Sequence, residues 1–303
     1  MLKIGFIGAG TVGTALAVRL AKEGYPIVAV SSRSIQSAQR LAGMIPDCQT
    51  WENPQEVADR ADLVFVTTPD DAVLRVVSQI NWHAGQSVLH CSGADSLLSL
   101  EPARWAGATV GSFHPLQTFA SVSQAIDNLP GSMFALEAEE PLLTTLKELA
   151  TSLEGKWVVL QGDDKVLYHV AAVMACNYMV TLVKLACDLW QTFGVSPEEA
   201  TQALMPLLRG TVNNIGNVGL PNCLTGPIAR GDLGTITKHL NALEKTAPEI
   251  LSTYRELGLK TIPVALAKGR INPEKAEALK DLLNRSLLQT DQVDVKPAQR
   301  RHA

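Results

Sequence analysis

LKIGFIGAGTVG, at residues 2–13, is the stretch that decides how the first half of the chain folds. Residues 2–7 form an apolar run that predicts a buried strand, and residues 14–21 continue at helical period. The three glycines of a G-x-G-x-x-G pattern stand between them, in the strand–turn–helix context that a dinucleotide-binding fingerprint requires. The stretch therefore predicts a nucleotide site rather than a purely structural turn.

Each glycine of this turn has its own predicted task. Gly8 permits the tight turn, Gly10 lets the backbone approach a pyrophosphate, and Gly13 lets the helix pack closely on the strand. The helix then begins at Thr11 and Val12, where exposed backbone amides and the helix dipole can hold an anion. These five residues are the predicted pyrophosphate site.

The type of cofactor is predicted from the end of the second expected strand. An NAD site usually carries Asp or Glu there, which accepts a hydrogen bond from the ribose 2′-hydroxyl. This chain has Ser31, Ser32 and Arg33 instead, which offer hydroxyl donors and a planar cation to a 2′-phosphate. We therefore predict NADP. Ser34 could equally serve only as the cap of the helix expected over 35–43.

The next expected strand also ends in a loop with polar residues. Thr67, Thr68 and Pro69 follow it, at the edge where ligands bind to parallel sheets. We expect these three residues to lie against the nicotinamide ribose or the pyrophosphate. The acidic residues that come next, Asp70 and Asp71, are expected to cap the following helix.

Ser92 and His114 follow two further expected strands, at 87–91 and 108–113. Because neighbouring strand ends face one crevice, the two side chains should lie close together. His114 precedes a proline, which favours an extended backbone. A lone histidine is usually structural, but loops at strand ends carry function, so both roles stay open for His114.

Length and composition limit the classes of protein. A chain of 303 residues with 46% apolar residues suggests two domains with a sizeable core. The net charge of −4 leaves no basic footprint for nucleic acid. The five cysteines are scattered without metal-ligand spacing, which predicts no metal site and a reducing, cytoplasmic setting. The chain starts with strand sequence, so no signal peptide is expected.

The pattern changes after residue 162, where strands give way to long helical periods. We predict an α/β fold in which residues 1–162 form a doubly wound Rossmann sheet that binds NADP. Residues 163–290 are expected to be an all-helical domain for substrate binding and dimerisation. Residues 291–303 are polar and are expected to be a frayed tail.

The helix expected from 164 to about 190 carries Lys165, His169 and Asn177 on one broad side. Polar groups in so apolar a helix must be satisfied or used. They could form a polar seam against the first domain, but we favour a row that faces substrate, because interdomain clefts are preferred ligand sites. His169, Asn177 and Lys184 within this apolar helix favour a buried interdomain helix over a membrane span.

The stretch 220–232 is rich in turn residues and is predicted to be an irregular loop. Long irregular loops in compact domains are usually functional. Arg230 could bind a substrate carboxylate through two N–H groups. Asp232 could contact substrate, or it could only cap the helix expected over 233–243.

Several motifs together resemble one family. The glycine turn, VTTPD at 66–70 and the helical second half resemble the β-hydroxyacid and 6-phosphogluconate dehydrogenase superfamily. Further motifs narrow the resemblance to the Rossmann-like family whose second domain was labelled domain of unknown function 2520. They are HCSG at 90–93, FHPLQ at 113–117, YHVAA at 168–172 with NY at 177–178, and LTGPIARGD at 224–232. The resemblance implies an NADP oxidoreductase, and one branch of the family resembles an alternative ketopantoate reductase.

The resemblance also implies roles for individual residues. Hydroxyacid dehydrogenases and ordinary ketopantoate reductase carry a lysine, then an asparagine four residues later, at the start of this helix. Lys165 matches the lysine, whereas His169 replaces the asparagine. The proton donor is therefore either Lys165 directly, or His169 with Lys165 as its partner. Ser92 and His114 resemble a serine and a histidine that prephenate dehydrogenases place at the same strand ends.

These residues predict an NADP-dependent oxidoreductase that reduces the carbonyl of a small, ketopantoate-like 2-oxoacid. The developing alkoxide needs a proton donor, for which Lys165, His169 and His114 are the candidates. Alternatives are imine reduction as in pyrroline-5-carboxylate reductase, oxidation as in prephenate dehydrogenase, and an NADPH-sensing protein without turnover. Superfamily relatives are usually dimers through the second domain, which implies a homodimer that uses neither nucleic acid nor membrane as a partner.

Overall fold

The computed structural model of the chain describes residues 2–162 and 164–285. By its packing the chain divides into two compact units, which adjoin in the sequence between Tyr178 and Met179. The predicted change from strands to helices is present, because the last strand ends at Val159 and helices follow. The predicted tail, 291–303, lies outside the described residues.

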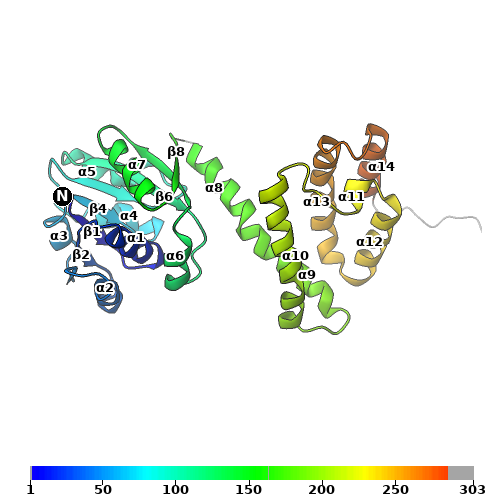
Figure 1. Cartoon of the computed structure of the whole chain (residues 1–303), viewed down its shortest axis with the longest axis horizontal. Helices are drawn as coiled ribbons and strands as arrows, with labels where there is room; N and C mark the ends of the chain where they lie inside the picture. Colours follow the sequence, from blue (N-terminus) through cyan, green and yellow to red (C-terminus); the bar gives the residue numbers. More distant parts are fainter. Residues whose placement is uncertain (1, 163, 286–303) are drawn as a thin grey trace, which may run out of the picture. The chain divides into compact units, whose positions relative to one another are not determined.

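The first unit is built on an eight-stranded sheet in the order β3-β2-β1-β4-β5-β6-β7-β8 (Figure 1). Neighbouring strands are parallel except β6 and β7, which pair antiparallel. The strands are β1 (Ile4–Ile7), β2 (Ile27–Ser31), β3 (Gln49–Trp51), β4 (Leu63–Val66), β5 (Ser87–His90), β6 (Thr109–Leu116), β7 (Met133–Ala138) and β8 (Lys156–Val159). This is the doubly wound Rossmann sheet that the sequence predicts.

Helices cover both faces of this sheet, because its strands alternate buried side chains between two cores. In β4, Leu63 and Phe65 join the core under α1, α2, α6 and α7. Val64 and Val66 join the core under α3, α4 and α5. The helices are α1 (Thr11–Lys22), α2 (Ile35–Ala42), α3 (Pro54–Ala58), α4 (Asp70–Val77), α5 (Glu101–Trp105), α6 (Val122–Asn128) and α7 (Leu142–Ser152).

The long helix expected from 164 to about 190 is two helices, α8 (Asp164–Ala175) and α9 (Asn177–Gln191), interrupted at Cys176. The prediction that this segment is buried is wrong for the single chain: of its residues, Lys165 and Cys187 are the buried ones. By length and composition alone, residues 164–191 could cross a membrane. In the most apolar stretch of 18 residues within this segment, 6% of the residues are buried. Leu167, Met174 and Val180 are among its exposed large apolar side chains.

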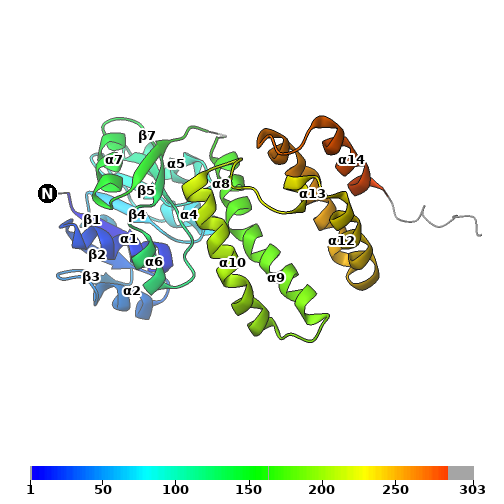
Figure 2. The same ribbon diagram turned by 45° about the vertical axis from the view of Figure 1, so that its right-hand side comes forward.

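The remaining helices belong to the second unit, and those after residue 226 form its own core. They are α10 (Pro197–Val218), α11 (Pro227–Arg230), α12 (Leu233–Thr246), α13 (Pro248–Ala267) and α14 (Pro273–Asn284). Within this unit α9 and α10 lie side by side (Figure 2). Ser196 and Glu199 form a capping box at the start of α10, as expected of Ser-Pro-Glu-Glu. The stretch 220–232, predicted as an irregular loop, contains one short helix because Pro227 fixes a helical φ at its start.

Candidate active site

The glycine turn after β1 has the geometry that the motif predicts. Gly8 has φ +116°, and a Cβ on it would lie 2.7 Å from the Thr67 carbonyl carbon and oxygen. A Cβ on Gly13 would lie 2.6 Å from the Gly8 carbonyl oxygen and would also overlap the Thr67 hydroxyl. Both positions therefore exclude a side chain, one through backbone conformation and both through close packing.

Gly10 differs from the other two glycines because a Cβ there would meet no atom within 4 Å. Its φ of −79° is ordinary for any residue, so the fold does not require glycine here. Gly10 instead lines a pocket of about 740 Å³ that opens beside the turn. The pocket is lined by residues 7–10, 31–37, 67–69, Glu52, Pro54, Ala72 and Arg75.

This pocket fits NADP. It adjoins the first residues of α1, whose amides can bind a pyrophosphate. Two hydroxyl groups of its lining, on Ser31 and Thr68, are buried and have no hydrogen-bond partner within the described chain. Buried polar groups of this kind are normally satisfied, so they fit a bound polar ligand. Ser32 and Arg33 line the same pocket, as predicted for a 2′-phosphate site.

Two features of the pocket were not predicted. Arg75 on α4 adds a second cation, from the same face as Ala72 three residues earlier. Glu52 adds a carboxylate after β3. Ser34 both lines the pocket and caps α2 by accepting from the Ser37 amide at 3.3 Å, so its two possible roles coexist. The helical spacing of Ala72 and Arg75 after the Thr67–Pro69 loop is the signal that could have identified the second cation.

The loops after β4 and β5 are joined by Ser92, which is 4% exposed. Its hydroxyl donates to Asp70 Oδ2 at 2.8 Å and accepts from the Asp95 amide at 2.9 Å and the Ala94 amide at 3.3 Å. The N-cap of α4 is Pro69, without a side-chain cap, so the expectation that Asp70 or Asp71 would cap this helix is wrong. Asp70 instead connects the loop of the cofactor pocket with the loop that carries Ser92.

Two histidines meet beside the same loop. A Cβ on Gly93 would lie 2.7 Å from His114 Nε2 and 2.8 Å from His169 Nδ1, so both ring nitrogens point at one small region. The other nitrogen of His114, Nδ1, lies 2.9 Å from the Tyr168 hydroxyl. His169 Nδ1 is buried and has no hydrogen-bond partner among the described residues. The structure thus brings together two of the predicted acids, His114 on β6 and His169 on α8.

Electrostatics keeps the His114 ring neutral. Burial, followed by the neighbouring His169 and Lys165, lowers the pKa of His114 to about 4. Burial and Lys165 similarly lower the pKa of His90, at the end of β5, to about 3. Burial raises the pKa of Tyr168 to about 12, so this phenol keeps its proton. At neutral pH, His90, His114 and Tyr168 are therefore neutral hydrogen-bonding groups.

Lys165, the third candidate acid, is held differently from the histidines. Its side chain is 2% exposed, and its ammonium group donates to Asp95 O at 2.5 Å and Ser112 Oγ at 2.9 Å. Glu137 Oε2 lies 3.4 Å away and completes an ion pair. Two oxygens thus accept hydrogen bonds from the lysine, and the carboxylate balances its charge. Sequence reasoning missed Glu137, which stands in an unremarkable strand pattern.

The other predicted substrate residues lie further along the chain. Asn177 stands in the first turn of α9. Arg230 lies on α11 and lines a separate pocket of about 390 Å³ in the second unit, together with Lys268 and Arg270. Asp232 caps α12 by accepting from the Thr235 amide at 3.0 Å and hydroxyl at 2.7 Å, which is the structural role that the sequence left open. Across 2–162 and 164–285 the structure holds no group of three or more His, Cys, Asp or Glu that could bind a metal.

Two family models match the chain. A Rossmann-like domain matches residues 1–115, and domain of unknown function 2520 matches residues 132–261. A curated relative, 2-(hydroxymethyl)glutarate dehydrogenase of Eubacterium barkeri, is 36% identical over 76 residues, which are 25% of this chain and 24% of that protein. The match thus spans about a quarter of this relative.

Solved structures share the fold over almost the whole chain. A Bacteroides fragilis protein provisionally designated an NADP oxidoreductase has a TM-score of 0.65 and 23% identity, covering 92% of this chain and 98% of its own. A reductive aminase of Aspergillus terreus, solved with NADPH and ethyl-5-oxohexanoate, has a TM-score of 0.59 and 17% identity. This match covers 93% of our chain and 92% of the aminase chain. At these identities the likeness shows a shared fold.

Proposed function

We propose that this chain is an NADP-dependent reductase of a small, ketopantoate-like 2-oxoacid. It belongs to the Rossmann-like oxidoreductase family with a C-terminal helical domain. The observation that carries the proposal is the convergence of His114 Nε2 and His169 Nδ1 beside Gly93. Asp70 and Ser92 tie this loop to the loop of the NADP pocket at 2.8 Å. Hydrogen-bonding groups for a carbonyl thus adjoin a pocket that fits the cofactor.

NADPH, when bound, supplies the hydride, and the protein must place a proton beside the oxygen that becomes an alkoxide. The Tyr168 hydroxyl lies 2.9 Å from His114 Nδ1, and in the tautomer in which it donates to Nδ1 the ring proton is on Nε2. Nε2 is the atom that faces Gly93 and the buried His169 nitrogen. His114 can then donate a hydrogen bond to the substrate oxygen while His169 orients it.

The test is a panel of 2-oxoacids, cyclic imines and prephenate, assayed for NADPH oxidation or NADP reduction. We expect 2-oxoacids to be reduced, with ketopantoate-like branched acids best. His114→Asn and His169→Asn should each lower the rate of hydride transfer by about 10²-fold, the usual size of a lost hydrogen-bond donor to a developing oxyanion. Their NADPH affinity should stay unchanged, because neither residue lines the cofactor pocket.

Other outcomes would replace the proposal. Faster turnover of a cyclic imine would make the chain an imine reductase, and oxidation of prephenate would favour the dehydrogenase model. Tight NADPH binding without any turnover would favour a sensor. A rate that stays normal in both histidine variants would show that the reaction occurs elsewhere.

We also propose that Arg230 binds the substrate carboxylate. Its guanidinium lines the pocket of the second unit beside two further cations, and no carboxylate contributes to that lining. Arginine binds carboxylates through two parallel N–H groups, which lysine cannot reproduce. Arg230→Lys should therefore raise KM for the oxoacid about tenfold, whereas Arg285→Lys, on the residue after α14, should not.

A homodimer is proposed for the assembly. α8, α9 and α10 leave large apolar side chains exposed, among them Leu167 (72%), Val180 (69%) and Leu207 (66%). Large apolar side chains exposed in such number in a soluble protein are typical of an interface. The five cysteines are free thiols, which supports the further proposal of a reducing, cytoplasmic setting.

A further inference from the structure

Glu137 stands on β7, opposite Ser112 of β6 in the antiparallel part of the sheet. Its carboxylate lies 3.4 Å from Lys165 Nζ, and its side chain is 17% exposed. The lysine it meets is among the most buried large side chains in the chain. An ion pair in such surroundings interacts far more strongly than one in solvent.

Lys165 is a fixed anchor for the start of α8. Its ammonium donates to the loop after β5 at Asp95 O and to β6 at Ser112 Oγ, and it pairs with β7 at Glu137. Tyr168 and His169 follow three and four residues later on the same helix, and therefore on the same side. The position of the anchor sets where both side chains lie relative to His114.

The charge of the anchor depends on Glu137. Burial lowers the pKa of Lys165, and Glu137 is the strongest of the groups that raise it, ahead of Asp95 and Cys91. His90 and His114 also face this ammonium: burial lowers the pKa of both rings, and Lys165 lowers it further. Removing the carboxylate would leave a buried ammonium without its ionic partner, which proteins tolerate poorly.

We propose that Glu137 is a positioning residue of the reductase site: it keeps Lys165 charged and seated, and thereby holds Tyr168 and His169 in place around His114. In this arrangement Lys165 supplies a fixed charge and an anchor. The kinetic part of the proposal rests on the proposed reductase activity, whereas the electrostatic part does not.

The electrostatic part is tested in the full chain without substrate. The protein is labelled with carbon-13 at Cε of its lysines, and their signals are followed by NMR as the pH is raised. The signal that is missing from the spectrum of Lys165→Met is the signal of Lys165. In Glu137→Gln the Lys165 signal should titrate at a pH lower by about one unit or more, because a neutral amide no longer stabilises the ammonium. The matched control, Glu139→Gln, removes an exposed carboxylate just beyond β7 and should leave the signal in place. An unchanged Lys165 titration in Glu137→Gln would overturn the proposal.

The kinetic part uses the pH dependence of oxoacid reduction. Glu137→Gln should lower kcat by about 10- to 100-fold, the usual effect of small misplacements, with KM for NADPH unchanged. The alkaline limb of its pH–rate profile should move to lower pH, and Glu137→Asp should restore part of both. An equal loss at every pH, with the limb in place, would mean a merely structural role. If Glu137→Gln does not fold, Glu137→Asp must show the same shifts at smaller size, or the proposal fails.

If no oxoacid is reduced, the proposed function fails, while the NMR titration still tests whether Glu137 stabilises the charged form of Lys165. If the titration is unchanged and reduction is normal, the positioning role fails while the proposed function stands. The two failures are therefore distinguishable.

Discussion

Gly10 and Gly13 belong to one motif, yet a side chain at Gly13 should disturb folding, whereas a side chain at Gly10 should disturb cofactor binding. Gly13 is packed against the Gly8 carbonyl at 2.6 Å, whereas Gly10 faces open space. We predict that Gly13→Ala destabilises the fold by about 1–3 kcal/mol, as overpacked positions do. Gly10→Ala should unfold at the wild-type temperature but bind NADPH at least tenfold more weakly, because its methyl group points where the pyrophosphate approaches. Thermal unfolding and fluorescence titration measure the two effects, and weakened folding in Gly10→Ala would contradict this division.

Arg33 is the residue on which cofactor choice should depend. Arg33→Asp places a carboxylate in a pocket wall formed by the serines at 31, 32 and 34. The added negative charge should weaken NADPH binding by tenfold or more and NADH binding far less, which inverts the preference. Arg40→Asp is the matched control, because Arg40 lies on α2 outside the pocket lining and contacts Ser37. Tighter binding of NADH than NADPH by the wild type would refute the prediction of NADP.

The two neutral histidines predict how stability depends on pH. His90 and His114 have folded-state pKa values of about 3 and about 4, below the ordinary value of 6.5. The unfolded chain therefore binds more protons below pH 6.5, so the stability from keeping these rings neutral is complete above that pH and is lost as the pH falls toward 4. Urea midpoints should fall between about pH 6.5 and 5, a window in which carboxylates remain ionised. His114→Asn should flatten this slope, and an unchanged slope would mean that the ring is not held neutral.

Among single residues, the sequence predicted those whose role depends on neighbours in the chain. It missed those whose role depends on a side chain far away in the sequence. The glycine turn could be interpreted because strand, turn and helix adjoin in the chain. Asp70 and Glu137 could not, since each acts through a side chain from another element, Ser92 and Lys165. From the residues next to them in the sequence, Asp70 is predicted to be a helix cap and Glu137 an ordinary strand residue.

At the scale of elements, the loops after β4 and β5 act as one unit because Ser92 joins them. Ser92→Ala leaves the amides of Ala94 and Asp95 and the carboxylate of Asp70 without this hydroxyl. Because Ser92 is buried but Asp70 is exposed and the amides of Ala94 and Asp95 are only partly buried, we expect a loss of about 1 kcal/mol in the free energy of unfolding. Ser87→Ala, on the more accessible start of β5, should cost less. Equal urea midpoints for the two variants would show that the Ser92 network does not stabilise the loops.

Element boundaries followed the sequence where local signals were strong. Ser196, Pro197 and Glu199 place the start of α10, and a continuous run of apolar residues places β4. The interruption between α8 and α9 at Cys176 was not predicted, since no Pro or Gly stands there to break the helical period. The exposure of α8 and α9 was missed for a similar reason, because an apolar helix looks the same whether its own chain or another chain covers it.

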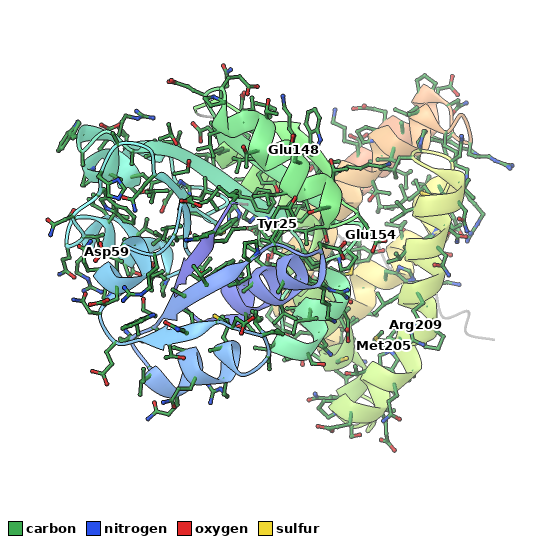
Figure 3. All side chains as sticks on the ribbon, turned by 60° about the vertical axis from the view of Figure 1, so that its left-hand side comes forward. Tyr25, Asp59, Glu148, Glu154, Met205 and Arg209 are labelled. Atoms are coloured by element: carbon green, nitrogen blue, oxygen red, sulfur yellow. The ribbon has the colours of Figure 1, made fainter. Side chains whose placement is uncertain are left out.

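At the scale of the whole molecule, the apolar surface of the second unit predicts self-association. α9 and α10 border a groove of about 420 Å³, lined by Met179, Val180 and Val183 on one side. Met205 and Arg209 lie one turn apart on the α10 side (Figure 3). A stable interface buries roughly 800 Å² per partner, which a run of apolar helices of this length can provide. A second copy is the occupant we propose, because two-fold contacts between identical patches are the commonest assembly.

We predict that the wild-type chain is a dimer by light scattering at micromolar concentration. Val180→Asp places a carboxylate in the groove and should weaken the dimer, because burying a charge in an interface is costly even with Arg209 in the same lining. Leu98→Asp is the matched control: Leu98 is 71% exposed and lies in a short 3₁₀ helix of the first unit, so its charge stays in water and the dimer should persist. A monomeric wild type would refute the proposal. Co-sedimentation of the wild type with lipid vesicles, abolished by Val180→Asp, would show instead that a membrane covers these helices.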